Sequence, residues 1–106
     1  VLGIGVWELS VNVDIQINSA SPALVQAALS TSSSSVSDAE MVMYHEGSGG
    51  TITSVGSKQY IRKYVNITAQ TTYYLITRAF TGSATGTIYN RNEISKCVIR
   101  AICAYL

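Results

Sequence analysis

Between Val6 and Ile17 the chain alternates between core-type and polar residues. One set of alternate positions holds Trp7, Leu9, Val11, Val13, Ile15 and Ile17, and the other holds Glu8, Ser10, Asn12, Asp14 and Gln16. Successive side chains of a β-strand point to opposite faces, so this pattern predicts a strand with one face on a core and one face in water. A helix would scatter the six apolar side chains around its circumference. The chain is therefore expected to fold as a sheet.

Length and charge limit the classes of partner. The 106 residues suit one domain, residues 1–106, and only 12% of them are charged, with a formal net charge of +1. This gives little attraction to nucleic acid, and no apolar run approaches the roughly 20 residues of a membrane span. The 47% hydrophobic content exceeds what a small solitary domain needs. We therefore expect some apolar surface to face another subunit. The start at Val1 rather than Met suggests either a processed protein or a segment of a longer one.

Two segments carry conflicting local signals. Ser21 and Pro22 could open a helix through residues 23–29, although Val25, Ala27 and Leu29 could equally line one face of a strand. Similarly, Ser37 and Glu40 have the spacing of a capping box before residues 41–45. Local propensity alone favours helix in the first segment, and the choice of strand for both rests on the resemblance described below.

The remaining segments indicate strands and turns. A Gly- and Ser-rich stretch occupies residues 46–58, and the segments after it alternate or are rich in β-branched and aromatic residues. Residues 60–68 and 71–80 are predicted to be adjacent strands joined by a short turn at Ala69 and Gln70. A short strand over residues 87–89 and a long final strand over 94–106 follow. Seven or eight strands without a confident helix are typical of a β-sandwich.

The order of these signals resembles the C-terminal head domains of trimeric bacteriophage tail fibres and related virion receptor-binding proteins. The resemblance rests on four stretches: Gly5-Val6-Trp7, Ala28-Leu29-Ser30-Thr31 before the serine run, residues 65–75, and the ending Ile102-Cys103-Ala104-Tyr105-Leu106. It implies an all-β, antiparallel sandwich of jelly-roll type with about eight strands, in which the second element is a strand. It also implies a homotrimer at an extracellular virion tip that binds a host-surface glycan or protein. Tyr105, where such tips often have Arg, and the two cysteines depart from the pattern.

Catalysis and metal binding find little support. His45, beside Glu46 at the edge of the Gly-rich stretch, is the only histidine. Neither a nucleophile with a base nor a set of three or four metal ligands is visible in the spacing. Cys97 and Cys103 lie six residues apart in one predicted strand, about 20 Å at roughly 3.3 Å per residue, so they should not pair with each other. We expect no enzyme activity and no cofactor.

The ligand-binding candidates lie in loops. Tyr89, Asn90, Arg91 and Asn92 combine an aromatic ring, two amides and a charge, a set that suits a hydroxyl-rich ligand such as a glycan. His45 and Glu46 form the second candidate. A solvated turn would account for the same residues. Trp7 is of the type that stacks on a sugar face, but its phase with Leu9 and Val11 favours a position in the core or at a subunit interface.

Three functions remain open from the sequence. The first is a receptor-binding tip of a virion fibre, and the second is a structural module that trimerises without binding a receptor. The third is a sugar-binding domain of a secreted bacterial protein or a trimeric head of the TNF or C1q type.

Overall fold

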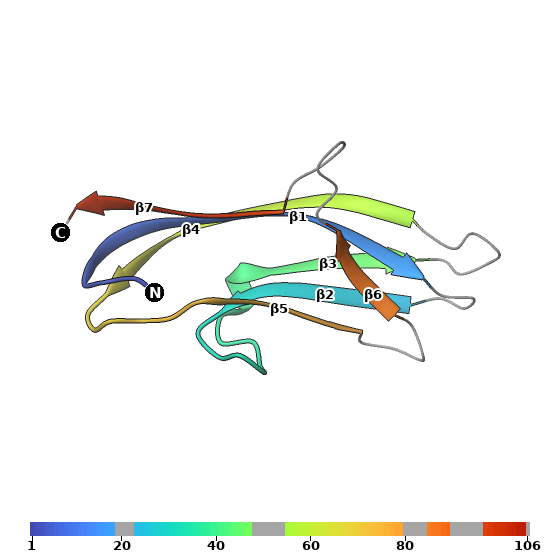
Figure 1. Ribbon diagram of the computed structural model, residues 1–106, viewed down its shortest axis with the longest axis horizontal. Helices are drawn as coiled ribbons and strands as arrows, with labels where there is room; N and C mark the ends of the chain where they lie inside the picture. Colours follow the sequence, from blue (N-terminus) through green and yellow to red (C-terminus); the bar gives the residue numbers. More distant parts are fainter. Residues whose placement is uncertain (19–22, 48–54, 80–84, 90–96, 106) are drawn as a thin grey trace.

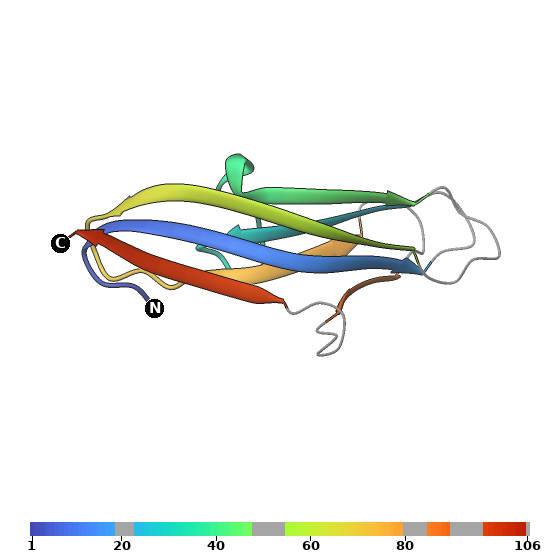
Figure 2. The ribbon, with the colours of Figure 1, turned by 90° about the horizontal axis from the view of Figure 1, so that it is seen from above.

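The chain folds into two layers of antiparallel β-strands. The computed structural model describes residues 1–18, 23–47, 55–79, 85–89 and 97–105. Within them lie seven strands: β1 (Gly5–Asn18), β2 (Ala23–Ser30), β3 (Val42–Gly47), β4 (Val55–Ile67), β5 (Tyr74–Ala79), β6 (Thr85–Tyr89) and β7 (Val98–Tyr105). One sheet, here the β1 sheet, contains β4, β1, β6 and β7, and the other, the β2 sheet, contains β3, β2 and β5. Figure 1 shows the layers edge-on and Figure 2 shows the β1 sheet from above. The predicted all-β sandwich is confirmed at this level.

Strand β1 is the centre of its sheet. It pairs with β4 over nearly its whole length, from Gly5 opposite Ile67 to Ile17 opposite Val55. Its other edge is shared, because β7 pairs with Val6–Asn12 and β6 pairs with Asp14–Asn18. The alternation of apolar and polar residues between Val6 and Ile17 therefore belongs to a strand that is paired on both sides, and the buried face of this strand fixes its register.

The second sheet settles both conflicts between helix and strand. β2 runs between β3 and β5, with Ala27 opposite both Met43 and Thr77. Residues 23–29 and 42–45 are thus strands, as the resemblance implied. The capping signal before residue 41 produces only a 3-10 helix, η1 (Ala39–Met41), and its cap is Asp38, whose side chain accepts a hydrogen bond from the Glu40 backbone. Tertiary pairing outweighs local helix propensity here, as it often does.

The core lies between the two sheets. Its most buried apolar residues are Leu9, Val11, Val13, Ile15, Val25, Ala27, Leu29, Met41 and Met43. Of the residues predicted to be buried, Leu9, Val11, Val13 and Ile67 are at most 3% exposed, whereas Trp7, Val65 and Leu75 are half-buried and pack against the margin of the core. The indole Nε1 of Trp7 donates to the carbonyl of Gly3 at 3.0 Å. Trp7 is therefore part of the packed end of the sandwich.

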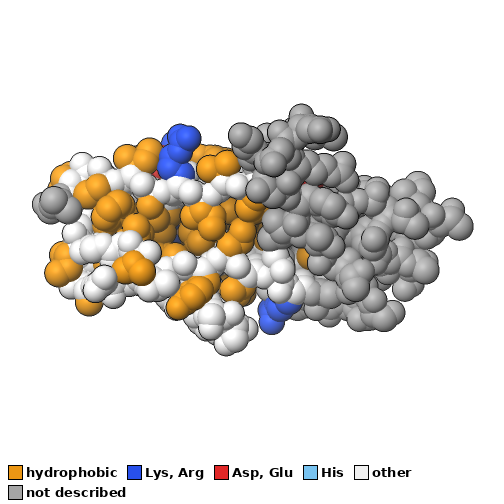
Figure 3. Space-filling model, viewed as in Figure 1, with side chains coloured by type: hydrophobic (Ala, Val, Ile, Leu, Met, Phe, Trp, Pro, Cys, Tyr) orange, Lys and Arg blue, Asp and Glu red, His pale blue; other side chains and the backbone are white. Residues whose placement is uncertain are grey.

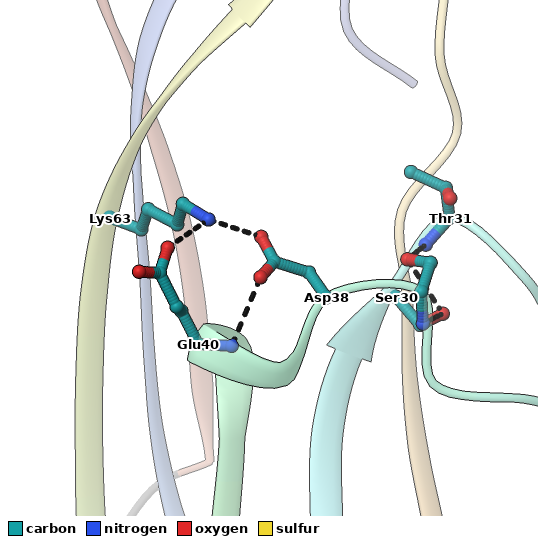
Figure 4. Close-up of polar contacts among 6 residues, drawn as sticks. Ser30, Thr31, Asp38, Glu40 and Lys63 are labelled. Carbon is teal, nitrogen blue, oxygen red and sulfur yellow. Dashed lines mark hydrogen bonds and ion pairs between the residues drawn. The ribbon is translucent and has the colours of Figure 1, made fainter.

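A charged side chain occupies one position in the inward phase of β4. Lys63 lies opposite Leu9, and its ammonium group reaches Asp38 Oδ2 at 2.6 Å and also pairs with Glu40. Figure 4 shows the two carboxylates converging on it, Glu40 from η1 and Asp38 from the position just before it. The hydrogen bond from Lys63 lowers the pKa of Asp38, and the same bond is the main cause of the raised pKa of Lys63. This ion pair joins η1 to β4 across the edge of the two layers.

One prediction of connectivity was wrong. Strands β4 and β5 are consecutive, but β4 pairs with β1 and β5 pairs with β2, so the segment 68–73 crosses from one layer to the other. The chain bends at Thr68 and Ala69, and Thr71 then forms a bridge with Leu2 instead of continuing back along β4. In the described part of the chain, no helix is long and apolar enough to cross a membrane.

Candidate functional site

Residues 31–37, here called the serine loop, are organised around one buried hydroxyl. Ser30 is fully buried, and its Oγ donates to the carbonyl of Ser35 at 2.6 Å. The same Oγ accepts from the backbone N–H of Ser32 at 3.0 Å and of Ser37 at 3.2 Å. Figure 4 labels Ser30 and Thr31 at the point where β2 ends and the serine loop begins. A loop rich in hydroxyls is thereby held in one conformation next to the β2 sheet.

A row of polar side chains crosses the outer face of the β2 sheet. Tyr44, Gln26 and Arg78 lie opposite one another on β3, β2 and β5. Gln26 is only 3% exposed, and its amide is bonded on both sides: Nε2 donates to Tyr44 Oη at 2.9 Å, and Oε1 accepts from Arg78 Nε at 2.6 Å. The buried amide therefore holds the guanidinium group of Arg78 at a defined place.

The serine loop and this row enclose a pocket. Its volume is about 110 Å³, and it is lined by Gln26, Ser33, Ser34, Ser35, Val36, Ile76, Thr77 and Arg78. A single water needs about 10–15 Å³ of such space, so the pocket admits several waters or a small polar group of a larger ligand. Its lining combines one cation, one amide, four hydroxyls and the apolar side chains of Val36 and Ile76. These groups suit a hydroxylated ligand and offer no base or nucleophile with an activating partner.

The predicted ligand-binding residues are not brought together in one sheet. Tyr89 is the last residue of β6, opposite Asp14 in the β1 sheet, whereas His45 and Glu46 lie on β3 in the β2 sheet, opposite Val25 and Leu24. Asn90, Arg91 and Asn92 lie outside the described residues, so their part in binding stays a prediction. His45 is half-buried, and its Nε2 is buried without a hydrogen-bond partner in the described part of the chain.

Neither cysteine is in a disulfide. Cys103 lies on β7 opposite Trp7, and Cys97 precedes that strand. Partial burial raises the pKa of the Cys97 thiol. Among the described residues no group of three His, Cys, Asp or Glu side chains could hold a metal ion.

A second surface stands out because it is apolar and uncovered. β7 contacts β1 on one side, and its side chains are exposed on both faces: Val98 is 38%, Ile99 51%, Ile102 49% and Tyr105 71% exposed. Figure 3 shows hydrophobic side chains gathered over the half of the molecule where β7 lies above β5.

The outward face of the β1 sheet carries two more exposed rings on β4. Tyr60 is 63% and Tyr64 58% exposed, and they lie opposite Asn12 and Glu8 on β1. A hydrogen bond to Glu8 is the main cause of the raised pKa of Tyr64. The Oδ1 atom of Asn12 is buried without a hydrogen-bond partner among the described residues. Aromatic rings and apolar β7 side chains thus share one outward face.

Sequence reasoning missed the pocket because its residues come from three separate segments. Gln26 lies in an apolar segment, and in a strand its side chain points to the face opposite that of Val25 and Ala27. This polar residue within an apolar segment was the one signal of the pocket in the sequence. The pairing of Gln26 with Arg78 spans 52 residues, which no local pattern reveals.

Comparisons with protein-family models, with curated proteins and with solved structures found no match to this chain.

Proposed function

We propose that this chain is a non-enzymatic receptor-binding domain at the tip of a bacteriophage tail fibre or similar virion attachment protein. In this proposal it is a homotrimer with a jelly-roll sandwich of about eight strands, and it binds a glycan or protein on the host surface. The observation that carries the proposal is the pocket between the serine loop and the outer face of the β2 sheet. It places hydroxyl, amide and guanidinium groups on a rigid scaffold, the arrangement that binding loops on sandwiches use.

Trimerisation would account for the apolar surface on β7. Soluble monomers rarely expose contiguous apolar patches larger than a few hundred Å². Here an edge strand exposes Ile99 on one face and Ile102 on the other, beside the rings of Tyr60 and Tyr64. An interface that uses two different patches of each copy can close into a ring, and a threefold ring would cover both faces of β7. A long apolar edge left uncovered would favour aggregation instead.

A trimer also makes weak binding useful. A shallow pocket of this size should bind one sugar only weakly, near the millimolar level. Three pockets on one tip, and several tips on one particle, raise the effective affinity by orders of magnitude through avidity. Attachment should therefore depend more steeply on the pocket than monovalent binding does.

The oligomeric state is the first test. Multi-angle light scattering should give three times the chain mass of 11.3 kDa. Ile102→Glu places a charge in the proposed interface and should yield a smaller species with an unchanged far-ultraviolet circular dichroism spectrum. Ala39→Glu, at an exposed position of η1, is the matched control and should stay trimeric. A wild-type protein that is monomeric at micromolar concentration would refute the trimer.

Adsorption to host cells is the second test. The wild-type trimer should compete with virions for the cell surface, and Arg78→Gln should weaken this competition. The double variant Tyr89→Ala with Arg91→Ala tests the loop predicted from the sequence in the same assay. A stable trimer that never competes would favour the alternative of a purely structural trimerising module, which the apolar β7 surface also supports.

A further inference from the structure

We propose that three copies of this chain pack through the outward face of the β1 sheet, with β7 of one copy against β4 of the next. This inference rests on the proposed function, because it names the surfaces and residues that join the homotrimer. Two columns of exposed side chains carry it. They are the aliphatic column of β7, Val98 and Ile102, and the aromatic column of β4, Tyr60 and Tyr64.

The two columns lie on the same face and at the same heights. Each member shares a partner on β1 with a member of the other column: Tyr60 and Val98 share Asn12, and Tyr64 and Ile102 share Glu8. Figure 2 shows β4, β1 and β7 side by side in this sheet. Each column spans four residues of its strand, about 13 Å at roughly 3.3 Å per residue. Rotation about an axis parallel to the strands therefore brings the two columns of neighbouring copies into register without any further shift.

The columns also differ in chemistry, which favours contact between unlike columns. The rings of Tyr60 and Tyr64 are 63% and 58% exposed, and aliphatic side chains such as Ile102 can cover their apolar faces. The hydroxyl of Tyr64 donates a hydrogen bond to Glu8 of the same chain. This bond holds the ring before assembly, so less side-chain entropy is lost at the interface.

The charged side chains of this face fit the same arrangement. Arg62 on β4 and Arg100 on β7 lie opposite Ser10, each between the two members of its column. Glu8 faces Arg62 at 4.0 Å and offsets its charge, whereas Arg100 shows no ion pair or hydrogen bond in the described part of the chain. In the proposed ring Arg100 lies between the two aromatic rings of the next copy, where a guanidinium gains cation–π contacts.

The β1 side chains between the columns favour three copies over two. A twofold packing of the same faces would press Glu8 and Asn12 against the same residues of the second copy. Like charges in direct contact destabilise an interface, and Oδ1 of Asn12 is already buried without a hydrogen-bond partner among the described residues. A threefold ring joins only the outer columns and leaves the β1 side chains along its axis.

Disulfide trapping tests the contact between the columns directly. The first pair, Tyr64→Cys with Ile102→Cys, is made in a chain that also carries Cys97→Ser and Cys103→Ser. Within one chain β1 separates the two new cysteines, so their Cα atoms are about 9–10 Å apart, too far for a disulfide. Mild oxidation should therefore link different copies. We expect covalent trimers on a denaturing gel, which reductant converts to single chains.

A shifted pair is the matched control. Tyr60→Cys with Ile102→Cys places the cysteines about 13 Å out of register and should give about tenfold less covalent trimer. Tyr60→Cys with Val98→Cys is a second pair in register and should link as well as the first, which keeps the test valid if the loss of Tyr64 disturbs folding. Equal yields from the shifted and the first pair, or covalent dimers without trimers, would overturn the inference.

Light scattering on the wild type keeps this inference distinct from the proposed function. A trimeric wild type whose two pairs in register both fail to link keeps the proposed trimer and overturns the contact between β7 and β4. A wild type that is monomeric at micromolar concentration overturns both. A trimeric wild type with linking by both pairs in register, and little linking by the shifted pair, supports both.

Discussion

Replacing Ser30 with alanine should cost this domain a large part of its stability, although it removes a single oxygen atom. The side chain is fully buried at the end of β2. Its Oγ serves the carbonyl of Ser35 and the backbone N–H groups of Ser32 and Ser37, with distances of 2.6, 3.0 and 3.2 Å. The variant therefore strips three backbone groups of their partner at once.

The expected cost follows from these contacts. A hydrogen bond contributes about 1 kcal/mol net, and more when a buried group is left without a partner. Water can replace part of the loss because much of the serine loop is exposed, so we expect about 2–3 kcal/mol in all. Domains of this size are stable by roughly 5–15 kcal/mol, and each kcal/mol shifts the melting temperature by about 4–8 °C. The variant should therefore melt roughly 10–20 °C lower.

Urea denaturation and calorimetry at one fixed protein concentration would measure this, since an oligomer's stability depends on concentration. Ser34→Ala is the matched control, because Ser34 is exposed and its hydroxyl makes no hydrogen bond that the structure shows within the described residues. It should change the free energy of unfolding by less than about 0.5 kcal/mol. Equal stability of the two variants would refute the view that the Ser30 hydroxyl organises the loop.

Two further predictions concern the scaffold. The folded state lowers the pKa of Asp38 from 3.8, so this group adds stability above about pH 4 that is lost as the pH falls through its folded pKa. Urea denaturation at pH 5 and pH 3 should thus show a smaller acid-dependent loss for Lys63→Met than for the wild type, and an equal loss would contradict the pairing. Ala28 is fully buried on the same face of β2 as Gln26, so Ala28→Leu should destabilise the fold by about 1–3 kcal/mol. Ala39→Leu, at an exposed position of η1, should be nearly neutral in the same melting assay, and equal losses would show that Ala28 has room for a larger side chain.

The sequence predicted the strands well wherever one face of a strand is buried. The alternation in β1 identified Leu9, Val11 and Val13 as core because burial itself sets the period of two. It could not place β4 and β5 in different sheets. A crossing from one sheet to the other and a short turn within one sheet look alike in the sequence between two apolar segments. Which strand pairs with which depends on contacts distant in sequence, such as the bridge of Leu2 with Thr71.

The candidate site could not be predicted from the sequence, for a related reason. The predicted binding loop, Tyr89 to Asn92, is a cluster of polar residues that are adjacent in sequence, and of these residues only Tyr89 lies in the described part of the chain. The pocket instead uses Gln26 and Arg78, which adjacent strands bring opposite each other. Gln26, a single polar residue inside an apolar strand, was the only local sequence signal of the row formed by Tyr44, Gln26 and Arg78.

The divided edge of β1 has a consequence for biosynthesis. The N-terminal half of β1 pairs with β7, so residues near position 6 can form these hydrogen bonds only after residues near position 105 have been synthesised. During translation β1 and β4 can associate early, but on the other edge of β1 the half from Val6 to Asn12 stays open until residues 98–105 have left the ribosome. Contacts this distant slow folding, and an open apolar edge invites intermolecular pairing in the meantime. A nascent chain stalled before residue 98 should therefore be a better substrate for chaperones than the finished domain.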